Sequence, residues 1–397
     1  MPDKADRDQI RRQNRSIILQ ALRRDGPLAR IELGQITGLS PATVTSITAD
    51  LLDQELIEGF ESTAAKEQTS RGRPRSLLKL KPGAAFVVCI RLSIQRLELS
   101  LVDYSGEIAG ELNADFDEGE LTSDTTARVL IDLVADLLTR AKVTTSAVRE
   151  IGLVAQGAVE VETGTIIWSP AIEGRNTAIV EPLKRAFSAN CHVSNDTNMI
   201  TEALHWSDPE RYGNTFVVLL LDYGVGMGLF LDGKLFSGMN GKAAEFGHSN
   251  HAPDGAMCLC GKKGCYEAYL SRSALSQVAP PDPNCEVSRF QAAIDMAAEG
   301  KAEALAHFRQ AGHVLGFGLA RIIALIDPAR IVLTGGSTKA MPFMEEGLKA
   351  GLASGLIDDL NQNYEIDVAP WDQNYIKRGM AAQAMRRLDL DFKGPGK

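Results

Sequence analysis

Residues 245–267 read EFGHSNHAPDGAMCLCGKKGCYE, a short glycine-rich stretch that combines one imidazole with three thiols. Its four candidate metal ligands are His248, Cys258, Cys260 and Cys265. Soft and borderline donors at such close spacing can close a tetrahedral Zn²⁺ site. Two carboxylates, Glu245 and Glu267, flank the set and are left to face whatever lies beside it.

The length and composition predict a small module joined to a larger body. A chain of 397 residues with 44% hydrophobic residues is too long for one compact core. No apolar run is long enough to span a bilayer, and residues 1–7 are too charged for a secretory signal. Three of the six cysteines lie within eight positions, which indicates metal ligands in a reducing compartment rather than disulfides. We therefore expect a cytoplasmic protein without membrane insertion.

Charge is unevenly distributed along the chain. The formal net charge of −9 argues against a protein that coats nucleic acid. Residues 1–80, however, contain 13 Lys and Arg against 11 Asp and Glu, a net charge of +2, so the remaining residues carry −11. Arginines cluster near residues 11–24 and 71–75. A local positive bias of this kind is typical of a surface that contacts phosphates.

The first 80 residues have the pattern of a winged helix. The predicted elements are helices over 8–24, 30–37 and from Pro41, and strands over 56–60 and 77–80. Ser40 is the expected N-cap of the third helix, with Pro41 at its first position. The apolar face of that helix is formed by Val44, Ile47 and Leu51.

The opposite side of the third helix carries small residues. They allow a close approach to a major groove, although only the hydroxyls can read a base edge. In the expected wing, arginines alternate with Gly and Pro, and such a stiff segment suits a narrow minor groove. The candidate DNA contacts are Ser40, Ala42, Thr43, Thr45, Ser46, Arg71, Arg73 and Arg75. The alternative is a trihelical packing or dimerisation module that does not bind DNA.

After residue 83 apolar runs alternate with helical stretches. Strands are predicted over 85–90, 97–102, 151–155, 190–194, 215–221, 228–231 and 331–334, and helices over 124–142, from Asn198 onward and over 302–326. Interleaving of this kind indicates α/β layering, most simply two lobes with a cleft between them. Turn glycines stand at the strand ends, where ligands bind in such sheets.

Several motifs of the body occur together in one known family. They are Asn195-Asp196-x-Asn198, Gly224-x-Gly226-x-Gly228, Asp232-Gly233-Lys234, Glu245-Phe-Gly-His248, Cys258-x-Cys260-Gly-x-x-Gly-Cys265-x-Glu267, and Asp327-Pro328 leading to Leu333-Thr-Gly335-Gly336. Over nearly its whole length the chain resembles the ROK (repressor, open reading frame, kinase) family, and the winged helix resembles its repressor branch. The resemblance implies a two-lobed α/β body with the actin-like ATPase fold over 83–397 and a zinc knuckle at 245–267. A winged helix-turn-helix DNA-binding domain is expected over 1–80, with the wing and linker at about 60–82.

The resemblance also implies two phosphate-binding loops, and both are altered. Kinases of the family carry an early Asp-x-Gly-Gly-Thr turn whose bare glycines let backbone N–H groups reach ATP phosphates. The aligned stretch runs from Arg91 to Gln95, with a cation in place of the carboxylate and branched Ile94 in place of a glycine. The second loop has Val225 where a hydroxyl residue is expected. We therefore predict a degenerate ATP site and no kinase activity.

The sugar side of the site matches the family better. Asp196 corresponds to the catalytic base, here vestigial, which can still accept a hydrogen bond from a sugar hydroxyl. Acceptor carboxylates interleaved with amide and imidazole donors suit a polyhydroxylated ligand. The expected effector contacts are Asn195, Asp196, Glu245, His248 and Glu267. Ala171 stands where the family usually has asparagine, so one polar contact is missing.

The metal is predicted to be structural, with one Zn²⁺ per chain. All four positions are filled by protein ligands, which leaves no place for an activated water. In the family one ring nitrogen of His248 faces zinc and the other can reach the ligand. The alternative role of Glu245 and Glu267 is support of the knuckle. His251 is expected to be a spare surface residue.

These features predict a sugar-responsive transcription regulator, a repressor of genes for carbohydrate uptake or metabolism. Its expected partners are double-stranded operator DNA, a small sugar or sugar derivative, and further copies of itself in a homodimer or homotetramer. Two alternatives stay open. One is an active sugar kinase with an appended DNA-binding module, and the other is a regulator controlled by a protein partner such as a component of the sugar phosphotransferase system.

Overall fold

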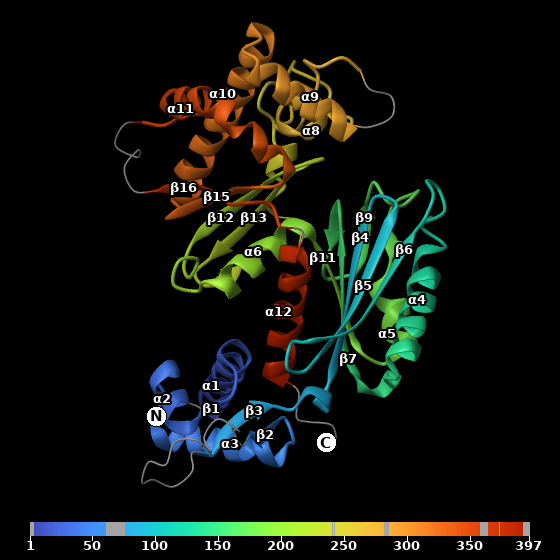
Figure 1. The fold of residues 1–397 in the computed structure, drawn as a ribbon, viewed down its shortest axis with the longest axis vertical. Helices are drawn as coiled ribbons and strands as arrows, with labels where there is room; N and C mark the ends of the chain where they lie inside the picture. The colour runs from blue at the N-terminus through green and yellow to red at the C-terminus, as the bar shows by residue number, and fades with distance from the viewer. Residues whose placement is uncertain are drawn as a thin grey trace. The chain divides into compact units, whose positions relative to one another are not determined.

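The chain divides into two compact units. The computed structural model describes residues 4–60, 76–239, 241, 243–281, 286–357, 364–372 and 374–391. The first unit comprises Met1–Asn195 together with Met380–Lys397, and the second comprises Asp196–Gly379. Figure 1 draws both units and labels many of their helices and strands.

The first unit begins with a winged helix, as the sequence predicts. Its elements are α1 (Lys4–Asp25), β1 (Leu28–Ala29), α2 (Arg30–Thr37), α3 (Pro41–Asp53), β2 (Ile57–Phe60) and β3 (Leu77–Leu80). Its three strands pair antiparallel in the order β1-β3-β2. Gly38, with φ of 69°, ends α2, and the side chain of Ser40 caps α3. The expected wing arginines Arg71, Arg73 and Arg75 lie outside the described residues.

The rest of the first unit is a mixed sheet with helices on one face. The sheet has the order β11-β7-β4-β5-β6, in which β11, β7 and β4 are parallel and β4, β5 and β6 are antiparallel. Its strands are β4 (Phe86–Ser93), β5 (Arg96–Asp103), β6 (Ile108–Asp115), β7 (Val148–Ala155) and β11 (Asn190–Asn195). Helices α4 (Thr126–Ala141) and α5 (Val180–Phe187) run along one face (Figure 1). α4 buries Leu130, Val134, Leu137 and Leu138, spaced for one helical face.

Smaller elements complete this unit. A three-stranded sheet has the order β10-β9-β8, formed by β8 (Ala158–Glu160), β9 (Thr165–Trp168) and β10 (Thr177–Ala178). Two 3₁₀ turns are η2 (Pro82–Ala84) and η3 (Thr145–Ala147).

The second unit is built on another mixed five-stranded sheet. Its order is β14-β13-β12-β15-β16, with β12, β15 and β16 parallel and β12, β13 and β14 antiparallel. The strands are β12 (Phe216–Leu221), β13 (Val225–Leu231), β14 (Lys234–Leu235), β15 (Arg330–Thr334) and β16 (Glu365–Val368). The helices are α6 (Asp196–Ser207), α7 (Glu267–Leu270), α8 (Arg272–Leu275), α9 (Glu286–Ala298), α10 (Ala302–Ile326) and α11 (Met341–Gly355), with 3₁₀ turns η4 (Phe246–His248) and η5 (Gly336–Ala340).

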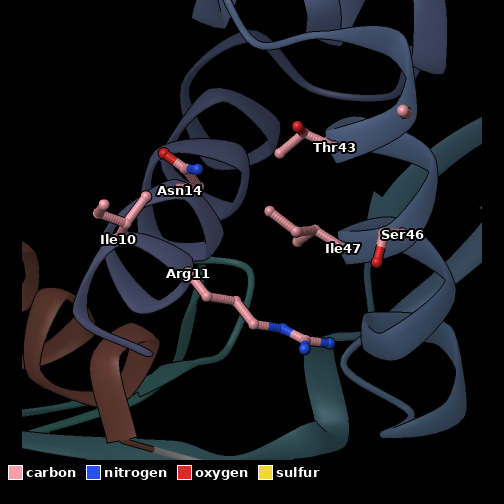
Figure 2. Close-up of a pocket in the computed structure, with 7 residues that line it drawn as sticks. Ile10, Arg11, Asn14, Thr43, Ser46 and Ile47 are labelled. Carbon is pink, nitrogen blue, oxygen red and sulfur yellow. The ribbon is translucent and has the colours of Figure 1, made fainter. Parts of the chain in front are cut away.

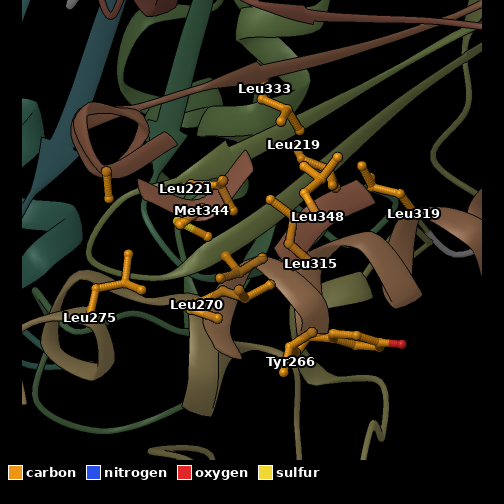
Figure 3. Close-up of a cluster of buried hydrophobic side chains, with 14 of the residues drawn as sticks. Leu219, Leu221, Tyr266, Leu270, Leu275, Leu315, Leu319, Leu333, Met344 and Leu348 are labelled. Carbon is orange, nitrogen blue, oxygen red and sulfur yellow. The ribbon is translucent and has the colours of Figure 1, made fainter. Parts of the chain in front are cut away.

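Every residue of β12 is buried, as expected for a central strand of a covered sheet. The core below it is drawn in Figure 3, where Leu219 and Leu333 of the sheet approach Leu315 and Leu348 of α10 and α11. These two helices pack backbone to backbone. A Cβ at Gly316 would lie 2.1 Å from the carbonyl oxygen of Leu348, so only glycine allows this approach.

Helix α12 (Asn374–Asp391) begins in the second unit and ends in the first. Several strand and helix ends differ from the prediction: α6 begins at Asp196 rather than Asn198, and β13 at Val225 rather than Gly228. Among the described residues, none of the helices combines the length and apolar character needed to cross a membrane.

Candidate functional site

The four predicted metal ligands come together in the second unit. His248 ends η4, and the three cysteines follow in a loop before α7. One ligand atom from each of His248, Cys258, Cys260 and Cys265 lies within 4.8 Å of the other three. The Nδ1 atom of His248 is 3.7 Å from Cys258 Sγ, and Cys260 Sγ is 3.7 Å from Cys265 Sγ. A nitrogen and three sulfurs so arranged fit the donor preference of a structural zinc site.

Tight turns hold the sulfur atoms in place. Cys258 donates its N–H to the carbonyl of Lys262, and Gly261 donates to the carbonyl of Cys258, at 2.8 and 2.9 Å. Gly264 has φ of 76°, and a Cβ there would lie 1.6 Å from the carbonyl oxygen of Ala252. Cys258 and Cys265 are buried whereas Cys260 is exposed. The cluster is therefore accessible from one side.

Glu267 links this cluster to the start of β13. Its Oε1 lies 3.5 Å from Cys258 Sγ and 3.9 Å from His248 Nδ1. Its Oε2 accepts a hydrogen bond from the N–H of Val225 at 3.0 Å. The carboxylate thus has the contacts of a residue that supports the knuckle, which was the alternative role considered from the sequence.

The other predicted effector residues of this unit are neighbours of the cluster. Asp196 opens α6 and accepts the N–H of Thr197 at 2.8 Å, and Glu245 directly precedes η4. Loss of surrounding water raises the pKa of Glu245; His248 opposes this shift, while Asp196 and Glu267 add to it. Asn195, the residue before Asp196, is the last residue of β11 and belongs to the first unit.

The glycines of the Gly224-x-Gly226-x-Gly228 motif have packing roles. A Cβ at Gly226 would lie 2.1 Å from Thr197 Oγ1, and one at Gly228 would lie 2.0 Å from Thr201 Oγ1. Both glycines therefore allow β13 to lie directly on α6. A Cβ at Gly224 would meet Glu267 Oε2 at 2.8 Å. The motif thus brings the loop, α6 and the metal-ligand cluster close together, independently of any phosphate.

An arginine lies at the carboxyl ends of the parallel strands β12 and β15. Arg272 of α8 forms an ion pair with Asp222, which follows β12, and its guanidinium stands 4.2 Å from the ring centroid of Tyr223. A Cβ at Gly336, just beyond β15, would lie 2.3 Å from Arg272 Nη2. Sequence reasoning missed this residue, because an isolated arginine between Ser271 and Ser273 has no periodic or spacing signal.

The stretch aligned with the first phosphate loop is a strand end and a tight turn. Arg91 and Ser93 still belong to β4, and Ser93 pairs with Arg96 across the hairpin. Gln95, with φ of 59°, forms the turn next to Ile94, which is 43% exposed. Arg91 pairs with Glu98 of β5 at 2.7 Å, so its charge is neutralised within the hairpin.

The outer face of α3 carries the residues predicted to face DNA. Ala42, Thr45 and Ser46 are exposed, while Val44, Ile47, Thr48 and Leu51 are buried. Ser40 Oγ accepts the N–H of Thr43 at 3.2 Å, and Thr45 Oγ1 donates to the carbonyl of Pro41 at 2.8 Å. Several hydroxyls of this helix are thus already bonded within the chain.

A groove runs beside this face, between α1 and α3. Figure 2 shows Ile10, Arg11 and Asn14 of α1 opposite Thr43, Ser46 and Ile47 of α3. The groove has a volume of about 420 Å³. Arg11 forms an ion pair with Asp50 of α3, and both side chains are largely exposed.

A winged helix-turn-helix joined to an α/β body with two five-stranded mixed sheets defines a DNA-binding module on an actin-like sugar-kinase body. The ROK family profile matches residues 87–387, and the chain belongs to the ROK family. A profile described as winged helix-turn-helix DNA-binding matches residues 11–58.

Named relatives align with most of the chain. The xylose repressor of Bacillus spizizenii is 24% identical over 382 residues, covering 96% of this chain and 97% of the relative. The DNA-binding transcriptional dual regulator NagC of Escherichia coli is 26% identical over 345 residues, covering 84% and 82%.

Solved structures show the same fold. A ROK family transcriptional regulator described as a homologue of the Escherichia coli MLC protein superposes with a TM-score of 0.76 at 24% identity, over 97% of this chain and 98% of that one. A ROK family glucokinase from Streptomyces griseus, in complex with glucose and AMPPNP, gives 0.56 at 23% identity, over 76% and 98%. About a quarter of this chain therefore lies outside its superposition with the kinase.

Proposed function

We propose that this protein is a sugar-responsive DNA-binding transcription regulator, and specifically a repressor of carbohydrate genes. The observation that carries the proposal is the combination of a winged helix-turn-helix with a body in which charged residues at or next to both expected phosphate loops are paired within the chain. Arg91 is bound to Glu98, and Arg272 is bound to Asp222. Two named regulators align with 96% and 84% of this chain at 24% and 26% identity, which supports the proposal.

DNA binding is assigned to α3 and the wing. The exposed small residues of α3 allow close entry into a major groove, and the groove beside it is flanked by Arg11 and Asn14. Ser40, Ala42, Thr43, Thr45 and Ser46 are the proposed contacts on the helix. Arg71, Arg73 and Arg75 are the proposed contacts in the wing. Paired modules in a homodimer or homotetramer would read two half-sites.

Effector binding is assigned to the polar groups near the knuckle. Asp196, Glu245 and Glu267 supply acceptors, Asn195 supplies an amide, and His248 supplies the Nε2 atom that does not face the cysteines. Such a set suits a ligand with many hydroxyl groups. The name of the xylose repressor suggests xylose as the first candidate.

The metal is proposed to be one structural Zn²⁺ held by His248, Cys258, Cys260 and Cys265. When bound, it would fix the orientation of the His248 ring through Nδ1. Three reduced thiols and a DNA target both suit the cytoplasm, where we place the protein.

We also propose that the protein does not transfer phosphate. Approach of an ATP phosphate to the β4–β5 hairpin would meet the branched side chain of Ile94, and no run of bare glycines is present there. The Arg272 guanidinium stands directly against Gly336, so an ATP phosphate would meet it there. Both features disfavour bound Mg·ATP.

Selection of duplexes from a random pool tests the proposed function. The wild-type protein is expected to enrich one sequence that resists competitor DNA at moderate salt. A thermal-shift screen of sugars should give a hit that also releases the selected duplex. Failure to enrich any duplex would contradict DNA regulation, and ATP-dependent phosphorylation of a sugar that Asp196→Asn abolishes would establish a kinase instead.

A further inference from the structure

A buried ion pair joins the first helix of the winged helix to the last turns of the chain. Arg23 lies in the last turn of α1, and Asp389 lies near the end of α12, so the two residues are 366 positions apart. Both belong to the first unit, and Figure 1 shows the end of α12 beside α1. Their side chains are 6% and 0% exposed.

The geometry of this pair is bidentate. Arg23 Nη1 is 2.8 Å from Asp389 Oδ2, and Nη2 is 3.1 Å from Oδ1. A planar guanidinium that matches both carboxylate oxygens fixes orientation as well as distance. The pair therefore favours this placement of α1 against the end of α12.

A third element closes the contact. Tyr104, which directly follows β5, is fully buried; its hydroxyl donates to Asp389 Oδ1 at 3.2 Å, and its carbonyl accepts from Arg23 Nη2 at 3.3 Å. The Arg23 guanidinium carbon is 5.4 Å from the Tyr104 ring centroid. A Cβ at Gly106 would lie 3.5 Å from the aliphatic carbons of the Arg23 side chain. Asp389 is thus held jointly by the DNA-binding module and the body.

The opposite end of α12 packs in the second unit. A Cβ at Gly379 would lie 1.9 Å from the carbonyl oxygen of Met199, so α12 lies against the backbone of α6 there. α6 is the helix that begins with Asp196. The first turns of α12 thus pack on α6 within the second unit, and Asp389 lies near its last turn, in the first unit.

From these contacts we infer that Asp389 is a positioning residue for DNA binding: through Arg23 and Tyr104 it fixes the winged helix on the end of α12, so that the module moves with that helix. The inference rests on the proposed DNA-binding function. A buried ion pair is a poor source of stability compared with apolar residues of the same volume, but it favours one geometry over others. The pair of Arg23 and Asp389 therefore contributes mainly to the position of the winged helix on α12.

The test compares three variants of the full-length protein with the wild type. Asp389→Asn removes the charge, and Arg23→Met combined with Asp389→Leu replaces the pair by apolar side chains that keep the contact packed. Asp115→Asn is the matched control, because it breaks the exposed pair of Arg96 and Asp115 in the same unit. Duplexes selected by the wild type are rebuilt with one half-site, or with two half-sites at several spacings.

The wild type should prefer one spacing of two half-sites. In Asp389→Asn the ratio of affinities for the preferred and the other spacings is expected to fall by about tenfold or more, because part of the avidity of two linked modules is lost. Binding to a single half-site should be retained. Amide hydrogen exchange should rise in the last turn of α1 and around Tyr104 but not in α3. The double apolar variant should recover the wild-type melting temperature without recovering the spacing preference, and Asp115→Asn should behave as wild type.

Three results would overturn the inference. They are an unchanged spacing preference in Asp389→Asn, the same loss in Asp115→Asn, and recovery of both melting temperature and spacing preference in the double variant, which would give the pair a purely structural role. Failure of the wild type to select any duplex is distinguishable from these, because it rejects the proposed function itself and this inference with it.

Discussion

Glu267 accepts a hydrogen bond from the backbone N–H of Val225 at 3.0 Å, while its second oxygen lies 3.5 Å from Cys258 Sγ. One carboxylate is therefore shared between the start of β13 and the metal-ligand cluster. Glu267→Ala should lower zinc affinity by about 10–100-fold, the usual cost of removing an outer partner of the ligands. Competition with a colorimetric chelator measures this change.

The matched control is Glu346→Ala, which removes a carboxylate that pairs with Arg309 on an exposed surface of the same unit. It should leave zinc affinity unchanged. Equal affinities in Glu267→Ala and the wild type would show that the carboxylate does not support the metal ligands.

Arg272→Ala should destabilise the second unit by about 3–5 kcal/mol, because it leaves the carboxylate of Asp222 without its cation in a largely buried site. The two side chains are 11% and 14% exposed. Burial raises the pKa of Asp222 and the Arg272 guanidinium lowers it, so loss of the arginine favours the protonated carboxyl. Urea denaturation measures the free energy of unfolding.

Arg309→Ala is the control for this substitution, since Arg309 and Glu346 are 56% and 75% exposed. An exposed pair is expected to contribute about 0–1 kcal/mol. Similar losses in the two variants would contradict the view that Arg272 stabilises the second unit by neutralising the buried Asp222.

His192 should make the first unit sensitive to mild acid. Burial lowers the pKa of this imidazole, with a further lowering by Arg387 and an opposing contribution from Glu150. As the pH falls through the unfolded value of about 6.5, the unfolded chain binds the proton first. The contribution of His192 to stability is thus complete above that pH and is lost as the pH falls toward the lower folded pKa.

Differential scanning calorimetry at a series of pH values tests this expectation. The melting temperature of the wild type should fall more than that of His192→Gln between about pH 7.5 and about pH 5.5, because glutamine does not titrate. Parallel curves for the two proteins would show that His192 is not the group responsible.

Local signals in the sequence were sufficient for much of the fold. The helix predicted over 302–326 has those bounds because its apolar residues are periodic, and α3 begins where Ser40 and Pro41 indicate. The clustering of His248, Cys258, Cys260 and Cys265 was also predictable, since they lie in one short segment with characteristic spacing. The strand β6, by contrast, was missed: it lies at the sheet edge and buries little, so it lacks an apolar run.

Contacts between distant residues were not predictable. The pairing of Arg23 with Asp389 depends on how α12 returns to the first unit, which no local pattern specifies. The prediction that His251 is a spare surface residue was wrong, because its ring packs near Tyr266 and Phe317, with centroids 5.2 and 5.8 Å away. The tertiary fold brings these aromatic rings to His251, and no local sequence pattern indicates such contacts.

Arg73→Ala should weaken binding to a selected duplex more than Ser46→Ala. The hydroxyls of Thr43 and Thr45 are bonded to Ser40 and to the Pro41 carbonyl, so α3 offers few groups for reading bases. An arginine that contacts the phosphates or the minor groove contributes across sequences, and its loss should reduce the slope of log affinity against log salt by about 1.

Titrations at several salt concentrations separate the two residues. Ser46→Ala should leave the salt slope unchanged. Lys79→Ala controls for the loss of a positive charge, because Lys79 pairs with Glu58 within the three-stranded sheet of the winged helix. If Ser46→Ala weakens binding more than Arg73→Ala and the salt slope stays constant in both, the recognition helix dominates the affinity. The wing would then serve a different purpose from phosphate or minor-groove contact.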